Sequence, residues 1–235
     1  MSKVAVVTGG SAGIGEATAR ALAEDGWTVY VAARRLERCE EVARAIGGVA
    51  VELDVTDQES VDRLASKLER VDLLVNNAGG AKSLDLLRDA DEEDWNWMYQ
   101  VNVFGTVRVT KALYPQLKAA KGLVVNLGSV AATDAYVGGS GYNAAKFGLR
   151  GLTRAMRREE AQNFIRVTEI DPGRVKTDFA LNRFAGDSAR ANEVYEGKLN
   201  LSAEDIAETI RWVASLPPHV NIDSVSIMPV DQAER

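Results

Sequence analysis

Short apolar runs and amphipathic segments alternate along the whole chain. The first apolar runs, at residues 4–7, 28–35 and 49–55, are rich in Val and Ala, and each is followed by a segment whose apolar residues recur at helical spacing. Short runs of this kind predict buried strands, and the segments between them predict helices. Further strands are expected at residues 72–75, 123–126, 164–173 and 220–230. Strands that alternate with helices predict an α/β fold: one doubly wound parallel sheet of about seven strands, with helices on both faces.

Helices and one irregular insert complete the predicted order. The helices are expected at residues 16–26, 36–46, 56–70, 91–120, 142–163 and 202–215. Residues 175–201 are instead polar, rich in small residues and poorly periodic, with room for one or two short helices. Loops of this length inside a compact domain are usually functional. We therefore expect residues 1–235 to form a single domain with a substrate lid at about 176–201.

Composition narrows the range of functions. The chain has 235 residues, of which 46% are hydrophobic and 26% charged, as in ordinary globular proteins. A net charge of −6 without a basic stripe argues against a nucleic-acid partner. No apolar run approaches ~20 residues and no secretory signal is visible, so we expect no membrane partner and a cytoplasmic location. The single Cys39 and the single His219 leave no material for a Cys-rich zinc site or a His-based triad, so no metal is expected.

A glycine-rich turn, TGGSAGIG at residues 8–15, lies between the first strand and the first helix. Glycines let the backbone approach a pyrophosphate, and the N-terminus of the helix offers free N–H groups and the positive end of its dipole. The spacing differs from the commoner G-x-G-x-x-G fingerprint. The cofactor contacts expected from this turn are Gly9, Ser11, Gly13, Ile14 and Gly15.

The second strand ends in Ala33, Arg34 and Arg35, where a dinucleotide-binding fold meets the adenosine ribose. An acid there would bind the 2′-hydroxyl, whereas arginine makes fork-like, charge-assisted bonds to phosphate. The alternative is that the two arginines merely open a surface helix. Because no acid is present, the pattern favours NADP over NAD.

Two further strand ends are candidates for the same cofactor. At the end of the third strand, next to Val55, Asp54 either touches adenine or caps the helix that begins near Thr56. The fourth strand is followed by Asn76, Asn77, Ala78 and Gly79. The Asn pair either satisfies backbone groups at the edge of the sheet or lines the floor of the cofactor site.

Tyr142 and Lys146 are the strongest candidates for chemistry. They are four residues apart, so on a helix they share one face. An ammonium held there favours phenolate over phenol, and we expect it to lower the pKa of Tyr142. A Tyr tuned in this way can exchange protons near neutral pH. Ser129 follows the strand at 123–126, and the glycines before Tyr142 suit the turn that would bring the two hydroxyls together. The alternative is an ordinary helix face.

Asn102 lies in the middle of a predicted helix, where Asn is a weak helix former. A local kink there would free a carbonyl or the side chain for a water molecule. A plain buried Asn is the alternative.

Together these motifs resemble the short-chain dehydrogenase/reductase family over essentially the whole chain. The resemblance rests on Thr8-Gly9-x3-Gly13-x-Gly15, Asn76-Asn77-Ala78-Gly79, Ser129, Tyr142-x3-Lys146 and Pro172-Gly173-x-Val175-x-Thr177. It implies a Rossmann-like single domain that binds the dinucleotide and carries the catalytic residues. The last motif adds Pro172, Gly173, Val175 and Thr177 to the expected cofactor contacts.

The resemblance also implies a role for each catalytic residue. Tyr142 would be the general acid/base, and Lys146 would lower its pKa and bind the nicotinamide ribose. Ser129 would hold the substrate oxygen, and Asn102 would hold a water in a proton relay. Thr177 would touch the nicotinamide carboxamide. Arg34 occupies the position that marks NADP users, although Ala12 stands where many of them carry a basic residue.

The C-terminal third resembles a narrower branch, the bacterial NADP-dependent 3-hydroxy acid dehydrogenases of the serine dehydrogenase and malonic semialdehyde reductase type. Arg183-Phe184-x-Gly186-Asp187 matches that branch, whereas the approach from Thr177 to Phe179 is one residue shorter. The resemblance implies hydride transfer between nicotinamide and a small alcohol or carbonyl, with Ser129, Tyr142 and Arg183 as substrate-binding residues. The alternative is a carbonyl reductase for other small aldehydes or ketones.

Two helical segments carry more apolar residues than one sheet face can cover. They lie at residues 94–118 and 142–163, and relatives in the family assemble through this pair. We expect a homotetramer, with a dimer as the alternative.

Overall fold

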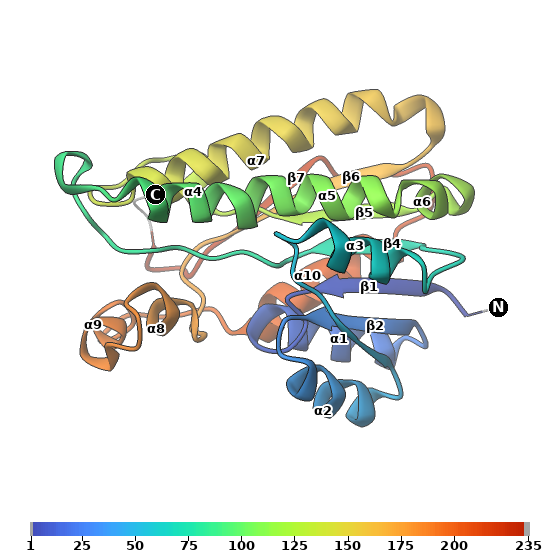
Figure 1. The fold of residues 1–235 in the computed structure, drawn as a ribbon, viewed down its shortest axis with the longest axis horizontal. Helices are drawn as coiled ribbons and strands as arrows, with labels where there is room; N and C mark the ends of the chain where they lie inside the picture. Colours follow the sequence, from blue (N-terminus) through green and yellow to red (C-terminus); the bar gives the residue numbers. More distant parts are fainter. Residues whose placement is uncertain (1, 233–235) are drawn as a thin grey trace.

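One seven-stranded parallel sheet forms the centre of the protein, with the strand order β3-β2-β1-β4-β5-β6-β7. The computed structural model describes residues 2–232; residues 1 and 233–235, which the single-domain prediction also included, lie outside the described residues. Helices lie on both sides of the sheet (Figure 1). The predicted α/β class, the number of strands and the doubly wound arrangement are confirmed.

The elements follow in the predicted order. The strands are β1 Val4–Thr8, β2 Thr28–Ala33, β3 Val49–Glu52, β4 Leu73–Asn76, β5 Leu123–Leu127, β6 Arg166–Pro172 and β7 Ser224–Ile227. The helices are α1 Gly13–Glu24, α2 Leu36–Ile46, α3 Gln58–Ala65, α4 Glu92–Tyr99, α5 Gly105–Ala112, α6 Tyr114–Ala120, α7 Ser140–Glu159, α8 Phe179–Arg183, α9 Ser188–Glu193 and α10 Ala203–Ser215. A π-helical segment spans Gln100–Phe104, and 3₁₀ turns span Leu87–Asp89, Val130–Ala132 and Ala161–Asn163.

Alternate residues of the central strands pack against different helix layers. In β1, Ala5 and Val7 join a core with α1, α2 and α10, whereas Val6 joins a second core with α3, α5, α6 and α7. Side chains alternate between the two faces of a strand, so both faces of this sheet are covered. This explains why the strands appear in the sequence as continuous apolar runs rather than as alternating patterns.

The helix expected at residues 56–70 is shorter than predicted. It begins at Gln58 because the Asp57 side chain accepts hydrogen bonds from the backbone N–H groups of Glu59, at 3.1 Å, and Ser60, at 3.2 Å. Asp54 is therefore not the cap, and that alternative is wrong. Its Oδ1 atom instead accepts bonds from the backbone N–H of Thr56, at 2.9 Å, and from the Thr56 hydroxyl, at 2.7 Å.

The long helical stretch expected at residues 91–120 is interrupted where the sequence indicated. The π-helical segment Gln100–Phe104 contains Asn102, so the chain departs from regular α-helical geometry at the residue that the sequence indicated. The helix that carries Tyr142 begins two residues earlier than expected, at Ser140, and ends at Glu159.

The insert at residues 175–201 holds the short helices α8 and α9, as expected. Its two ends meet in a parallel bridge between Val175 and Leu201, where the Lys176 N–H donates to the Leu201 carbonyl at 2.8 Å. The insert is thus anchored at its base, and its function as a lid stays a prediction.

The strand order fixes the place of a crevice. The sheet continues from β1 through β2 to β3 on one side and from β4 to β7 on the other. Loops after β1 and β4 therefore leave toward opposite faces, and a crevice opens at the carboxyl ends of the strands. Within residues 2–232, no helix combines the length and apolarity that crossing a membrane requires.

Candidate active site

A cavity of about 1340 Å³ opens at the carboxyl ends of the strands. Every site residue predicted from the sequence lines it except Gly15 and Asn102. The cavity collects residues from the loops after β1, β2, β3, β4, β5 and β6 and from the insert. Its position, at the carboxyl ends of the strands where the strand order reverses, is typical of a cofactor site.

The glycine-rich turn presents backbone N–H groups to this cavity. Helix α1 begins at Gly13, and its N-cap residue, Ala12, makes no side-chain capping bond within the described chain. Gly9 and Gly13 have φ angles of 66° and 55°, in the left-handed region that favours glycine. An uncapped helix start with an approachable backbone is suited to an anionic phosphate.

Gly15 has a packing role instead. A Cβ atom on Gly15 would lie 2.3 Å from the Gly9 carbonyl oxygen and 2.5 Å from Nδ2 of Asn77. Glycine at this position lets the first turn of α1 pack directly on the loop after β1. Gly15 does not line the cavity, because the position of its missing side chain faces the protein, and its contact with a cofactor stays a prediction.

Thr8 and Asn77 join the loops that follow β1 and β4. The Thr8 hydroxyl accepts hydrogen bonds from the backbone N–H groups of Asn77 and Ala78, both at 3.0 Å. In the other direction, Nδ2 of Asn77 donates to the Thr8 carbonyl at 2.9 Å. Asn77 thus satisfies backbone groups and also lines the cavity, and its contact with a cofactor stays a prediction. Asn76 does not line the cavity, because its Nδ2 atom donates to Asn126 at 2.9 Å.

Two arginines stand at the end of β2, beside the glycine-rich turn. Both Arg34 and Arg35 line the cavity. Nη2 of Arg35 donates to the Ser11 hydroxyl at 3.2 Å, which holds this guanidinium next to the turn. Asp54 and Val55 line the same region. The arrangement places two permanent cations where a phosphate on a bound nucleotide would meet them.

Asn102 is buried, with 1% of its surface exposed, and its side chain is fully engaged by the protein. Nδ2 donates to the carbonyl oxygens of Gly80 and Met98, both at 2.8 Å, and Oδ1 accepts from the Gly80 N–H at 3.2 Å. The side chain is therefore not free for water, and that part of the expectation is wrong. The Asn102 side chain fixes the loop after β4, and residues 80–82 of this loop line the cavity.

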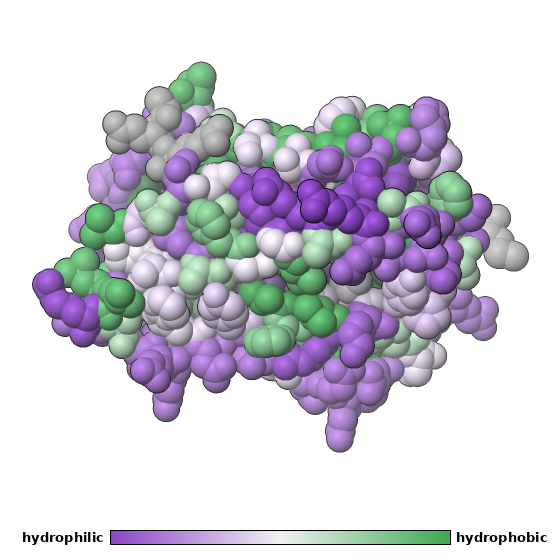
Figure 2. All heavy atoms as spheres, turned by 90° about the horizontal axis from the view of Figure 1, so that it is seen from above, coloured by the Kyte–Doolittle hydropathy of each residue, from purple (hydrophilic) through white to green (hydrophobic). Residues whose placement is uncertain are grey.

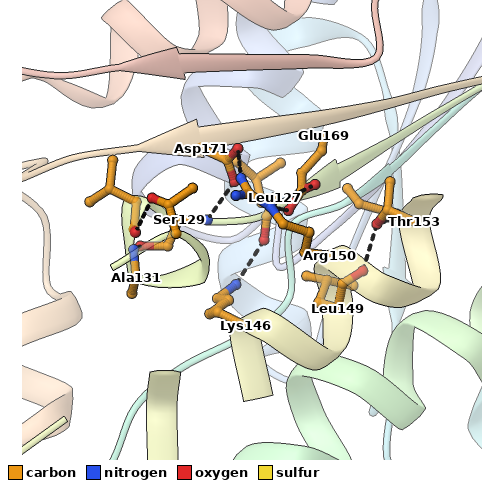
Figure 3. A network of polar contacts seen from close by, with 12 residues as sticks. Leu127, Ser129, Ala131, Lys146, Leu149, Arg150, Thr153, Glu169 and Asp171 are labelled. Atoms are coloured by element: carbon orange, nitrogen blue, oxygen red, sulfur yellow. Dashed lines mark hydrogen bonds and ion pairs between the residues drawn. The ribbon is translucent and has the colours of Figure 1, made fainter. Parts of the chain in front are cut away.

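Tyr142 and Lys146 lie on α7, and both are buried. Nζ of Lys146 donates to the Leu127 carbonyl at 2.7 Å (Figure 3). The same atom lies 5.7 Å from the centroid of the Tyr142 ring. Burial lowers the pKa of Lys146 to about 8, although the charges of Asp171 and Glu169 oppose this shift. The Ser129 hydroxyl accepts a bond from the Ala131 N–H at 3.1 Å.

The pKa of Tyr142 shifts in the opposite direction from the prediction. Burial raises the pKa of Tyr142 above its ordinary value, while hydrogen bonding from Ser129 and the charge of Arg183 lower it less. The expected lowering by Lys146 is wrong in this arrangement, because loss of solvation disfavours the phenolate more than the nearby cations favour it. Tyr142 is consequently a neutral phenol at pH 7.

Arg183, on α8, brings a cation over the same tyrosine. Its Nε donates to the Ser83 carbonyl at 2.6 Å, and its Nη1 donates to the Tyr136 hydroxyl at 2.8 Å. The guanidinium carbon lies 5.7 Å from the centroid of the Tyr142 ring. Within residues 2–232, the buried Nη2 atom has no hydrogen-bond partner. A buried guanidinium N–H without an acceptor marks a place where an anion would fit.

Several residues of this site carried no clear signal in the sequence. Tyr136 and Ser83 hold Arg183, and the Phe179 ring lies with its centroid 5.6 Å from that of Tyr142. They come from loops and from the insert, where periodicity says nothing about position. Phe179 stands two residues after Thr177, and this proximity in the chain is the one signal that would have found it.

Comparison with known proteins agrees with this geometry. The sequence profile of the family described as short chain dehydrogenase matches residues 3–187. The chain is 53% identical over 232 residues to an uncharacterised oxidoreductase of Mycobacterium tuberculosis, covering 98% of this chain and 92% of that protein. It is 37% identical over 238 residues to an NADP-dependent 3-hydroxy acid dehydrogenase of Salmonella typhi, covering 98% of this chain and 96% of that protein. The closed form of a serine dehydrogenase complexed with NADP+ matches with a TM-score of 0.95 and 35% identity, covering 98% of this chain and 96% of that chain.

Proposed function

Since the chain belongs to the short chain dehydrogenase family, it is an oxidoreductase, and we propose that it moves a hydride between NADP and a small 3-hydroxy acid or its semialdehyde. Two similar proteins support this choice: one is an NADP-dependent 3-hydroxy acid dehydrogenase, and the other is a serine dehydrogenase complexed with NADP+. The cavity itself supplies the further arguments.

The residues at one end of the cavity fit a dinucleotide with a 2′-phosphate. The uncapped start of α1 and the left-handed Gly9 and Gly13 suit the pyrophosphate. Arg34 and Arg35 suit the 2′-phosphate. Thr177 lies against the glycine-rich turn, since a Cβ on Gly13 would come within 3.4 Å of its Cγ2 atom. When bound, NADP supplies the hydride acceptor or donor.

Ser129, Tyr142 and Lys146 would handle the substrate oxygen and its proton. Ser129 and Tyr142 would each hold the oxygen by a hydrogen bond, because both hydroxyls line the same cavity. The neutral Tyr142 would donate a proton to the oxygen of a carbonyl substrate, and in the reverse direction the phenolate would take it back. Lys146 would keep a positive charge close to that phenolate. Asn102 would act through the loop after β4, whose position its side chain fixes.

Arg183 carries the argument for an acidic substrate. Its buried Nη2 atom has no acceptor in the described chain, and the guanidinium sits over the ring of Tyr142. A 3-hydroxy acid that presents its hydroxyl to Tyr142 places its carboxylate a few ångströms away. The carboxylate would give Nη2 the missing acceptor through a charge-assisted bond.

A matched pair of substrates tests this proposal. We expect a short 3-hydroxy acid to be oxidised with NADP far more efficiently than its methyl ester, with absorbance of NADPH as the readout. Arg183→Gln is expected to raise KM for the acid by roughly tenfold to a hundredfold, the worth of a hydrogen bond to a charged group, and to leave KM for the ester unchanged. Arg190→Gln, which removes another cation of the insert outside the cavity, serves as the control. Equal efficiency with acid and ester would favour a carbonyl reductase for other small aldehydes or ketones.

Assembly and location complete the proposal. Phe104 and Phe147 expose 47% and 46% of their surface. On the face of the molecule seen from above, hydrophobic residues lie among hydrophilic ones (Figure 2). Exposed aromatic side chains of this kind are typical of interfaces. We propose a homotetramer, with a dimer as the alternative, in the cytoplasm. Residues 176–201 would act as the substrate lid.

A further inference from the structure

Two buried carboxylates and a half-buried arginine lie next to the segment that carries Ser129. Glu169 and Asp171 are two residues apart on β6, so their side chains share one face of the strand. Only 1% of Glu169 and 0% of Asp171 is exposed. Nε of Arg150, on α7, donates to Glu169 at 3.3 Å, and Nη2 of Arg150 is bonded to Asp171 (Figure 3). We refer to Arg150, Glu169 and Asp171 as the carboxylate cluster.

The carboxylate cluster contacts the Ser129 segment. Oδ1 of Asp171 accepts a hydrogen bond from the backbone N–H of Ser129 at 3.1 Å. A Cβ atom on Gly128 would lie 2.1 Å from the same oxygen and 2.8 Å from Oε1 of Glu169. The turn that carries the Ser129 hydroxyl therefore rests on the two carboxylates without an intervening side chain.

Lys146 lies one helical turn before Arg150 on α7, and its Nζ bonds the carbonyl of Leu127, the residue before Gly128, at 2.7 Å. Lys146 and the two carboxylates therefore contact adjacent residues of the same turn. Two carboxylates and one guanidinium leave a net charge of −1 when both acids are ionised. Desolvation raises the pKa of both acids, that of Glu169 to about 7, with Asp171 adding to the shift of Glu169. The neighbouring strands place uncharged residues next to these acids: Asn126 of β5 pairs with Glu169, and Ser226 of β7 pairs with Asp171. Arg150 is the cation bonded to both acids, and the charge of the acids acts on Lys146.

Stability alone does not account for such a cluster. Taking three charges out of water costs several kcal/mol per ion, and apolar replacements of buried ion pairs are often neutral or stabilising. A role in the site explains why the charges lie next to Ser129 and Lys146. We propose that Arg150, Glu169 and Asp171 are positioning residues for the dehydrogenase reaction: Asp171 fixes the backbone of Ser129, and the net negative charge keeps Lys146 protonated. This inference rests on the proposed function of Ser129 and Lys146.

Three substitutions separate the two roles. Asp171→Asn removes the charge and keeps an acceptor oxygen for Ser129, whereas Asp171→Ala removes both. Glu169→Gln copies the protonated form that Glu169 adopts below its pKa of about 7. Asp72→Asn is the matched control, because Asp72 also accepts a backbone N–H, that of Val4 at 2.9 Å, and pairs with an arginine, but at the opposite end of the sheet. Each variant is measured for kcat between pH 6 and 9, for thermal stability and for backbone hydrogen exchange.

The expected results differ among the variants. In Asp171→Asn the alkaline fall of kcat should move to lower pH, because Lys146 loses a charge that opposes its deprotonation. In Glu169→Gln kcat should match the wild type at pH 6 and fall below it above pH 7. The reason is that Glu169 of the wild type is mostly ionised only above its pKa of about 7. Asp171→Ala should lose about 10²-fold in kcat, a typical cost of misplacing a catalytic group, and should show faster exchange at residues 128–131 without added cofactor. Asp72→Asn should change stability alone.

The outcomes that overturn the inference are distinct from a failure of the proposed substrate. Inactivity of the wild type with hydroxy acids would refute the substrate class, and the pH profiles would then be measured with the aldehyde or ketone that the enzyme does reduce. Unchanged alkaline limbs in both Asp171→Asn and Glu169→Gln would refute the electrostatic role. Unchanged exchange at residues 128–131 in Asp171→Ala would refute the positioning role. If Asp171→Ala does not fold, Glu169→Gln still decides the electrostatic role. This substitution replaces one carboxylate oxygen by an amide nitrogen and keeps the shape of the side chain.

Discussion

Nζ of Lys146 donates its hydrogen bond to the carbonyl of Leu127, at 2.7 Å, rather than to the hydroxyl of Tyr142 one turn earlier on the same helix. The ammonium lies over the tyrosine ring, 5.7 Å from its centroid. Lys146 therefore joins the end of β5 to α7 and so helps to hold the two elements that carry Ser129 and Tyr142. Its positive charge acts on Tyr142 from over the ring, without a hydrogen bond to the hydroxyl.

Replacing Lys146 by Met should remove both activity and cofactor affinity. We expect a loss of ~10²-fold or more in kcat, because a cation beside the tyrosine and a link between two elements are lost together. The wild type should lose kcat above about pH 8, since Lys146, with its pKa lowered to about 8, is protonated below that pH and neutral above it. Lys146→Arg is the control, because it keeps a cation at all these pH values. A profile of kcat that stays flat to pH 9.5 would contradict the role of Lys146.

Replacing Arg34 by Ala should change the choice of cofactor. The affinity for NADPH is expected to fall by roughly tenfold to a hundredfold, the range of one charge-assisted bond, while the affinity for NADH hardly changes. Quenching of protein fluorescence by the two nucleotides measures this directly. The prediction fails if the wild type uses NAD as efficiently as NADP.

Replacing Gly15 by Ala should disturb the glycine-rich turn without touching the cavity lining. The added methyl group would lie 2.3 Å from the Gly9 carbonyl oxygen, so the loop or the helix must shift. We expect a loss of about 1–3 kcal/mol in the free energy of unfolding and weaker binding of NADPH. The control is Gly151→Ala in the middle of α7, where a Cβ meets no atom of the described chain within 4 Å. That control should stabilise the protein slightly, because alanine is the better helix former.

Assembly can be tested at the exposed aromatic residues of the π-helical segment and α7. Phe147→Asp places a charge in the proposed interface and should shift the protein toward smaller species in light scattering at micromolar concentration. Phe164→Asp is the control, because Phe164 exposes 66% of its surface and lies outside both helical segments, after the 3₁₀ turn Ala161–Asn163. A wild-type monomer at this concentration would exclude both the tetramer and the dimer.

The course of the chain was predictable, because the central strands of the sheet are buried on both faces. The apolar runs at Val4–Thr8 and Leu123–Leu127 follow from that burial, and the residues after them meet at one edge of a parallel sheet. Local chemistry was enough to place the glycine-rich turn, Arg34 and the Tyr142 helix. Helix ends were less predictable, because a cap such as Asp57 competes with equally suitable neighbours.

The electrostatics of the site were not predictable from spacing. The pKa of Tyr142 depends on how much water is excluded, and that follows from residues distant in the sequence such as Phe179 and Arg183. In the sequence, the charged Glu169 and Asp171 resemble solvent-exposed positions of a strand. In the structure both are buried, and Arg150 of α7, which is distant in the sequence, bonds to Glu169. Asn102 was placed correctly at a kink, but its partner at Gly80 comes from another loop.

Tyr142→Phe is the decisive test of the chemistry. The substitution removes the hydroxyl that exchanges the proton and keeps the ring that packs against Phe179. We expect the variant to fold, to bind NADPH and to lose ~10³-fold or more in kcat, in line with what acid–base catalysis contributes. Because burial raises the pKa of Tyr142, the wild type holds a phenol at neutral pH, which favours reduction. Oxidation needs the phenolate, so its rate should rise from pH 6 to pH 8 while the rate of reduction does not.

A second tyrosine provides the control for this variant. Tyr136 accepts the bond from Nη1 of Arg183, so Tyr136→Phe should raise KM for an acidic substrate and leave most of kcat. Loss of kcat in both variants to the same extent would indicate damage to the cavity rather than loss of a proton donor. If Tyr142→Phe kept more than about a tenth of the wild-type kcat, on a substrate whose turnover is limited by chemistry, Tyr142 would not be the acid–base residue. The proton would then have to come from another group, and Ser129 would be the next to test because its hydroxyl lines the same cavity.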